Sequence, residues 1–166
     1  MSNLTDLISA GGGGTLFTIP VTKSTTWTPP FDGTAVIHVI GAGGSGATSQ
    51  ANELAGGGAA GGYSRKVVTL STGTNWTMVV GASGAPEYGQ GYGNAGGNSS
   101  ATDGSSTLTA NGGGGGLNGS STPAAGGTAS GGDVNNSGGA GGGGSLAAGT
   151  GGAVGILGTG NAGTNH

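Results

Sequence analysis

Short runs of apolar and polar residues, rich in Val, Ile, Thr and Trp, recur through the first half of the chain. The first run alternates apolar and polar residues, and the others are short and β-branched, as is typical of strands. These runs predict four or five strands and lie at 15–22, 25–28, 34–40, 64–70 and 75–80. Residues 105–110 are a candidate for one more edge strand, and Ser-Thr-Gly-Thr at 71–74 predicts a turn. Because these runs lack helical periodicity, we expect a mainly β fold, a small antiparallel β-sandwich or jelly-roll-like pair of sheets.

The N-terminal segment has a different apolar pattern. Leu4, Leu7 and Ile8 have helical spacing behind candidate caps at residues 2 and 3, and glycines 11–14 end the pattern. One or two helical turns are not stable alone in water, so the segment is either disordered or docked. We predict that it docks on a partner and that the glycines form a flexible hinge to the body.

Glycine supplies 46 of the 166 residues, and most of it falls in tracts at about 41–62, 81–104 and 111–163. Collagen is excluded because there are only five prolines and no triplet register across the whole chain. A disordered glycine-serine linker remains an alternative for 111–152 on composition. The low charge of the chain argues against it, because low charge favours association over solvation.

One tract has a regular period. Its glycines recur every third residue, with apolar pairs at 153–154 and 156–157 between them, and they are Gly149, Gly152, Gly155 and Gly158. In an extended left-handed threefold helix three residues make one turn, so these glycines would form a spine along one edge. The apolar residues would form the adjoining edges and need cover, which favours an ordered, packed tract.

Composition and charge exclude several classes of partner. The formal net charge is −3, and the three cations, Lys23, Arg65 and Lys66, form no patch for nucleic acid. The chain has no cysteine, which excludes disulfides and thiolate metal sites. The N-terminus lacks the basic region of a signal peptide, and no apolar stretch is long enough for a membrane helix. We therefore expect synthesis in a host cytoplasm, with neither nucleic acid nor membrane as a partner.

Candidate catalytic motifs are weak. Residues 41–46, Gly-Ala-Gly-Gly-Ser-Gly, follow a predicted strand and match the dinucleotide-binding fingerprint, but no long helix can follow them. His38 lies within a predicted strand, and His166 is the last residue. The six carboxylates are scattered singly, with no pair at metal-ligand spacing, and are Asp6, Asp32, Glu53, Glu87, Asp103 and Asp133. We therefore expect no enzyme activity, no cofactor and no metal site.

Four glycine-rich motifs in order carry a resemblance to a known family. They are Val-Ile-Gly-Ala-Gly-Gly-Ser-Gly at 39–46, Gly-Gly-Gly-Ala-Ala-Gly-Gly-Tyr-Ser-Arg-Lys at 56–66, Leu-Thr-Ala-Asn followed by five glycines at 108–116, and Gly-Gly-Thr-Ala-Ser-Gly-Gly-Asp-Val-Asn at 126–135. Together they resemble the glycine-rich domain of phage and prophage tail-fibre and adhesin proteins, over roughly residues 15–163. The resemblance implies a β-sandwich from which polyglycine II helices extend as a hydrogen-bonded bundle. The opening residues 1–14 are similar to the N-termini of virion proteins of marine phages.

With this resemblance the chain divides into three regions. Residues 1–14 are the anchor and hinge, residues 15–110 a β-sandwich interrupted by glycine-rich excursions, and residues 111–166 a region rich in polyglycine II. Loops that join such helices would carry variable chemistry, and the best candidate is 85–94. Its candidate contact residues are Glu87, Tyr88, Gln90 and Tyr92; the tyrosines would either contact a partner or cap the sheet edge.

We therefore expect a viral structural protein, displayed on the virion as a fibre, spike or decoration. Its expected partners are other tail or capsid proteins, bound through the N-terminus, further copies of itself, for which a trimer would suit a spike, and a host surface glycan. Two alternatives remain open: a dedicated receptor-binding adhesin, and a self-assembling extracellular filament or matrix protein.

Overall fold

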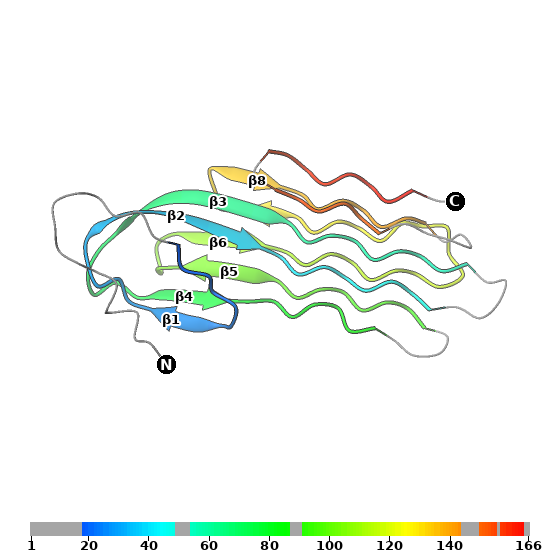
Figure 1. The fold of residues 1–166 in the computed structure, drawn as a ribbon, viewed down its shortest axis with the longest axis horizontal. Helices are drawn as coiled ribbons and strands as arrows, with labels where there is room; N and C mark the ends of the chain where they lie inside the picture. The colour runs from blue at the N-terminus through cyan, green and yellow to red at the C-terminus, as the bar shows by residue number, and fades with distance from the viewer. Residues whose placement is uncertain (1–17, 49–53, 87–90, 144–149, 156, 165–166) are drawn as a thin grey trace.

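The computed structural model describes residues 18–48, 54–86, 91–143, 150–155 and 157–164. In these residues the chain forms eight strands and no helix. One antiparallel sheet has the order β1 (Thr25–Trp27), β4 (Trp76–Val79), β5 (Ser99–Thr102), β6 (Thr107–Ala110) and β7 (Ala129–Ser130), and the other has β2 (Gly33–Ile40), β3 (Tyr63–Leu70) and β8 (Val134–Asn136). The prediction of a mainly β, sandwich-like fold with two antiparallel sheets is confirmed (Figure 1).

The predicted strands agree with the observed ones where the apolar runs are β-branched. β1, β2, β3, β4 and β6 fall within one residue or two of the predicted runs. The turn at 71–74 is confirmed, because Thr74 N–H donates to the Ser71 carbonyl and Gly73 has a positive φ of 86°. The run at 15–22 was expected to be a strand, but its described part, 18–22, is not; Pro20 cannot donate to a ladder.

Three strands were missed because they lie in stretches assigned to the glycine tracts. β5 has only small side chains, Ser-Ser-Ala-Thr, and β7 and β8 are two and three residues long. β7 and β8 also place part of residues 111–166 in each of the two sheets. The boundary at residue 110 therefore does not separate the sheets from the glycine tracts.

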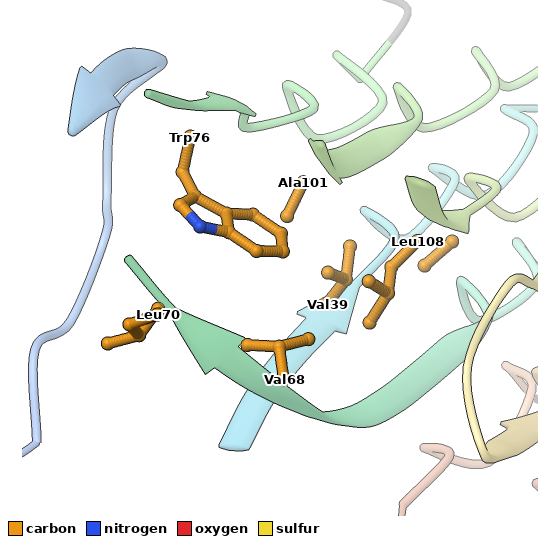
Figure 2. Packing of buried hydrophobic residues seen from close by; sticks show 7 residues of the cluster. Val39, Val68, Leu70, Trp76, Ala101 and Leu108 are labelled. Atoms are coloured by element: carbon orange, nitrogen blue, oxygen red, sulfur yellow. The ribbon is translucent and has the colours of Figure 1, made fainter. Parts of the chain in front are cut away.

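A small apolar core holds the two sheets together (Figure 2). Trp76 on β4 and Leu108 on β6 are its largest fully buried side chains. Val39 on β2 and Val68 and Leu70 on β3 face them from the other sheet (Figure 2). The core thus contains residues from both sheets, and its burial is the main apolar contribution to stability at this end of the molecule.

The outward faces of the two sheets differ. On the five-stranded sheet, cross-strand partners place hydroxyls in rows, of which the first is Thr26, Thr77, Thr102 and Thr107. On the three-stranded sheet, Val36 and Val67 are cross-strand partners and each is 46% exposed, while Ile40 is 60% exposed. The outward face of the five-stranded sheet is therefore mainly hydroxyl-bearing, with Val79 as its exposed apolar residue, whereas apolar rows alternate with polar ones, such as Thr34 and Thr69, on the three-stranded sheet.

Extended glycine tracts leave the sheets and run side by side toward the opposite end of the molecule (Figure 1). The described parts of this glycine-tract bundle are residues 41–48, 54–62, 81–86, 91–98, 111–118, 124–128, 137–143, 150–155 and 157–164. We call the end of the bundle farthest from the sheets the loop end (Figure 1).

Candidate functional site

The glycine-tract bundle is held by backbone hydrogen bonds with a period of three residues. In tract 41–48, the N–H groups of residues 41, 44 and 47 donate to tract 56–62, at 2.9–3.0 Å. The N–H groups of residues 42, 45 and 48 donate to tract 91–97, at 2.9–3.1 Å. A β-ladder has a period of two, so these tracts are not continuations of the sheets.

The carbonyl groups of the same tract extend the pattern to further neighbours. Ala42 and Ser45 carbonyls accept from Gly113 and Gly116, each at 2.9 Å, and the Gly43 carbonyl accepts from Gly84. Tract 41–48 therefore bonds to four neighbouring tracts, whereas a β-strand bonds to two at most. The result is a three-dimensional network and not a sheet.

Tract 56–62 lies at the centre of this network. Its N–H groups at 56, 59 and 62 donate to residues 117, 114 and 111, and those at 57 and 60 donate to residues 142 and 139. Residues 56–59 and 61–62 are all buried. Five of the seven N–H groups of residues 56–62 thus donate to other described tracts, which offsets much of the cost of burying this backbone.

Glycine is required where tracts approach most closely. A Cβ built on Gly44, Gly58 or Gly113 would lie closer than 3.0 Å to backbone atoms of a neighbouring tract. Gly43 is different: it is exposed, and a Cβ there would meet only the Ala59 carbonyl oxygen, at 3.8 Å. The need for glycine therefore follows the three-residue period, and the outward position of each turn can carry a side chain.

Side chains tie the tracts together in a way that sequence reasoning missed. Ser45 Oγ donates to the Ala85 carbonyl at 2.9 Å and accepts from Asn94 N–H at 2.8 Å. Asn98 Oδ1 accepts from Gly112 N–H at 2.9 Å. Ser and Asn next to glycine were the available signal, because short polar side chains bond readily to nearby backbone.

The predicted glycine spine at 149–158 is not one continuous edge. Gly155 and Gly158 pair with each other in an isolated antiparallel bridge, so the chain reverses between them, and a Cβ on either would meet nothing within 4 Å. Gly152 does lie in a close contact, because its Cβ would be 3.0 Å from the Asn161 carbonyl oxygen. Gly149 lies outside the described residues. The three-residue period of the sequence therefore corresponds to close packing at Gly152 and to a turn farther along.

The loop end contains the described part of the predicted contact loop. Tyr92 is 63% exposed there, next to Gly91, which forms a bridge with Thr48. Glu87, Tyr88 and Gln90 lie outside the described residues, as do the predicted anchor residues Leu4, Leu7 and Ile8. Within the described residues, the buried side-chain atoms without a hydrogen-bond partner are Thr48 Oγ1 and Asn118 Oδ1, both near this end. Unmet hydrogen-bonding capacity is therefore found at the loop end.

The described carboxylates accept hydrogen bonds from backbone. Thr72 donates its N–H (2.6 Å) and its hydroxyl (2.8 Å) to Asp32 Oδ1, which lowers the pKa of that carboxyl. The N–H groups of Ser106 and Ser105 likewise lower the pKa of Asp103, and Asp133 Oδ2 accepts from Val67 N–H at 2.9 Å. His38 Nδ1 lies 2.7 Å from the Tyr63 hydroxyl. Within the described residues no three metal-binding side chains come together, and no described helix is long and apolar enough to cross a membrane.

Four of the six backbone N–H groups in the glycine motif at 41–46 are engaged. The N–H groups of residues 41, 42, 44 and 45 all donate to carbonyls of other tracts. A dinucleotide fingerprint needs such donors free for a pyrophosphate at a helix N-terminus. No helix follows the motif in the part of the chain that the structure describes, although the fingerprint requires one.

The fold and the bundle together define an all-β protein in which a small sheet pair supports extended glycine tracts. A family model described as a glycine-rich domain matches residues 18–166. The chain belongs to this glycine-rich domain family, as the resemblance had indicated. A search of the curated proteins finds no match.

Proposed function

We propose that the glycine tracts are polyglycine II helices and that this chain is a phage structural protein, displayed on the virion as a fibre, spike or decoration. The observation that supports the first part is the period of three in the hydrogen bonds, since polyglycine II has three residues per turn. At about 3.1 Å per residue, an eight-residue tract such as 41–48 spans about 25 Å. Such a bundle is a rigid spacer between the sheets and the loop end.

The arrangement of the two ends supports display on a particle. The described chain begins at residue 18 at the sheet end, and the loop end lies opposite (Figure 1). A segment that anchors the chain through residues 1–14 would therefore hold the loops away from the surface to which it binds. Copies of the chain and other tail or capsid proteins are the proposed partners, and the virion is the proposed location.

The role we propose is structural and not catalytic. Asp32, Asp103 and Asp133 bond to backbone donors, and His38 bonds to the Tyr63 hydroxyl. These contacts account for the described carboxylates and histidine as parts of the scaffold. We accordingly propose no cofactor, no nucleic acid and no membrane as partners.

Incorporation into particles tests the virion role. The triple variant Leu4→Ser, Leu7→Ser, Ile8→Ser removes the apolar stripe of the anchor, and the matched control Thr5→Ser, Asp6→Asn changes polar positions of the same segment. We expect the triple variant to fold but to be missing from purified particles, as measured by mass spectrometry, with the control retained at the wild-type copy number. Retention of the triple variant at that number would reject the anchor. Absence of the wild-type protein from particles would reject the virion role.

A second candidate function is adhesion to a host surface glycan, and the exposure of Tyr92 at the loop end favours it. An exposed tyrosine can stack on a sugar ring while its hydroxyl remains in water. The double variant Tyr88→Ala, Tyr92→Ala should abolish attachment to host cells. Leu157→Ala is a matched control, because Leu157 is 99% exposed but lies in the turn tied to β8. Normal attachment by the double variant would reject adhesion through these tyrosines and favour a passive spike or decoration protein.

A further inference from the structure

The outward face of the three-stranded sheet differs from what a solvated sheet face requires. An antiparallel sheet with one face in water alternates apolar inward and polar outward residues. On the five-stranded sheet β5 and β6 follow this rule, with threonine and serine outward, while β4 has one exposed apolar residue, Val79. β2 departs from this rule in the run Ala-Val-Ile-His-Val-Ile at 35–40, where Val36 and Ile40 are apolar and outward, although the outward residues Thr34 and His38 are polar. Such a run is typical of a strand that is covered on both sides.

The exposed apolar side chains gather at the middle and at one end of this face. Val36 and Val67 are cross-strand partners near the middle of β2 and β3, and Ile40 follows at the end of β2. Asn136 on β8 shares a cross-strand row with Tyr63 and Ile40, and its Nδ2 donates to the Gly155 carbonyl at 2.6 Å. That hydrogen bond connects β8 to the turn at Gly155. Leu157, in the same turn, is 99% exposed.

We propose that this face, defined by Val36, Ile40 and Val67, is an interface between two copies of the chain. The natural complement of an apolar sheet face is another sheet face at a distance of about 10 Å, and two identical sheets have the matching twist. A twofold axis near the Val36–Val67 pair would place each pair against its copy, as an isologous contact requires.

Charge and area also suit a second copy. Arg65 is cross-strand partner to both His38 and Val134, and Asp133 precedes Val134 at the edge of the sheet. Asp133 Oδ2 accepts from Val67 N–H, so it is the other carboxylate oxygen that each copy can offer to the guanidinium of its partner. The net charge of −3 on 166 residues gives little long-range repulsion. Two strands of eight residues and one of three cover about 300 Å², less than half of the roughly 800 Å² per partner of a standard stable interface. We therefore expect weak, concentration-dependent association, which display of many copies on one surface would strengthen.

Cross-linking tests the face directly, because the chain has no cysteine. Val36→Cys places one thiol near the proposed axis, and Val79→Cys places one on the outward face of the other sheet, with similar exposure of 46% and 43%. With a short bismaleimide, the full-length Val36→Cys protein should give covalent dimers at a concentration at which Val79→Cys gives almost none. Equal yields from the two variants, or none from either, would overturn the proposal.

Sedimentation of the full chain is the second measurement. The variant Val36→Thr, Val67→Thr keeps the β-branched shape and gives this face the chemistry of the other sheet. A twofold interface carries each change twice, so the dimer should dissociate about 100-fold more readily, while Val79→Thr should behave as wild type. Wild-type protein that stays monomeric at every concentration would overturn the proposal. Association of the double variant equal to that of wild type would also overturn the proposal. The proposal would be overturned in the same way if deletion of residues 1–17 abolished association and the double variant did not. None of these outcomes depends on a virion role.

Discussion

Substitution of alanine for Gly44 and for Gly43, two neighbouring glycines, should have opposite effects on stability. At Gly44 the added Cβ would lie closer than 3.0 Å to the Gly114 and Gly113 backbone. Relief would require tract 41–48 to move away from tract 111–118, which would weaken bonds such as Gly113 N–H to the Ala42 carbonyl at 2.9 Å. Overpacking costs about 1–3 kcal/mol and each lost hydrogen bond about 1 kcal/mol, so we expect a loss of about 2–4 kcal/mol.

At Gly43 the Cβ fits, with the Ala59 carbonyl oxygen at 3.8 Å as the nearest atom. Alanine there should therefore stabilise the protein by about 0.4–1 kcal/mol, because it reduces the conformational entropy of the unfolded chain. For a chain of this size 1 kcal/mol corresponds to roughly 2–4 °C in the unfolding midpoint.

Thermal unfolding followed by calorimetry measures both variants against wild type. Gly44→Ala should lower the midpoint by about 5–15 °C, and Gly43→Ala should raise it by about 1–4 °C. Equal shifts for the two variants, or a Gly44→Ala protein as stable as wild type, would refute the close packing of the tracts.

Three further predictions concern single positions. Gly152→Val should destabilise the protein while Gly155→Val should not, since only the Cβ at 152 would meet a neighbouring backbone. In chemical denaturation the midpoint should therefore be lower for Gly152→Val than for Gly155→Val, and the reverse would contradict the observed turn. Ser45→Ala should cost about 1–2 kcal/mol, because it removes two bonds between tracts, and an unchanged denaturation midpoint would show that water replaces them. The folded-state pKa of Asp103 is lowered from 3.8, so the stability it contributes is present above that value and is lost as the pH falls through the lower, folded pKa. Asp103→Asn should therefore reduce the loss of stability of the protein below about pH 4, and a pH profile identical to wild type would count against this bond.

The sequence predicts the sheets better than the bundle, for a physical reason. β2, β3 and β4 contain β-branched and aromatic side chains whose burial stabilises them, so their composition identifies them. β5 consists of small residues, and it forms because Met78 and Leu108 lie on the strands to either side of Ala101. Neighbours in space decide that strand, and a single sequence does not contain them.

The loops and the spine show the same limit. The three-residue period was visible at 149–158, yet the strongest case of it lies at 41–48, where Ala and Ser interrupt the glycines. Which glycines need to lack a Cβ depends on which tract lies alongside, as Gly43 and Gly44 show. Of the candidate contact residues only Tyr92 lies in the described chain, so the contact loop stays a prediction.

Amide exchange measured residue by residue tests the central claim most directly, namely that the tracts form an ordered network of threefold helices. In tract 41–48 the N–H groups of residues 41, 42, 44, 45, 47 and 48 donate to other tracts, while Gly43 and Gly46 are exposed and donate no hydrogen bond to a described residue. These hydrogen bonds predict slow exchange at the first six positions and fast exchange at Gly43 and Gly46. Two protected amides would then be followed by one unprotected amide along the tract. Fast exchange at all eight positions would show a disordered tract, and alternate protection with a period of two would show a β-ladder; either result would contradict the account.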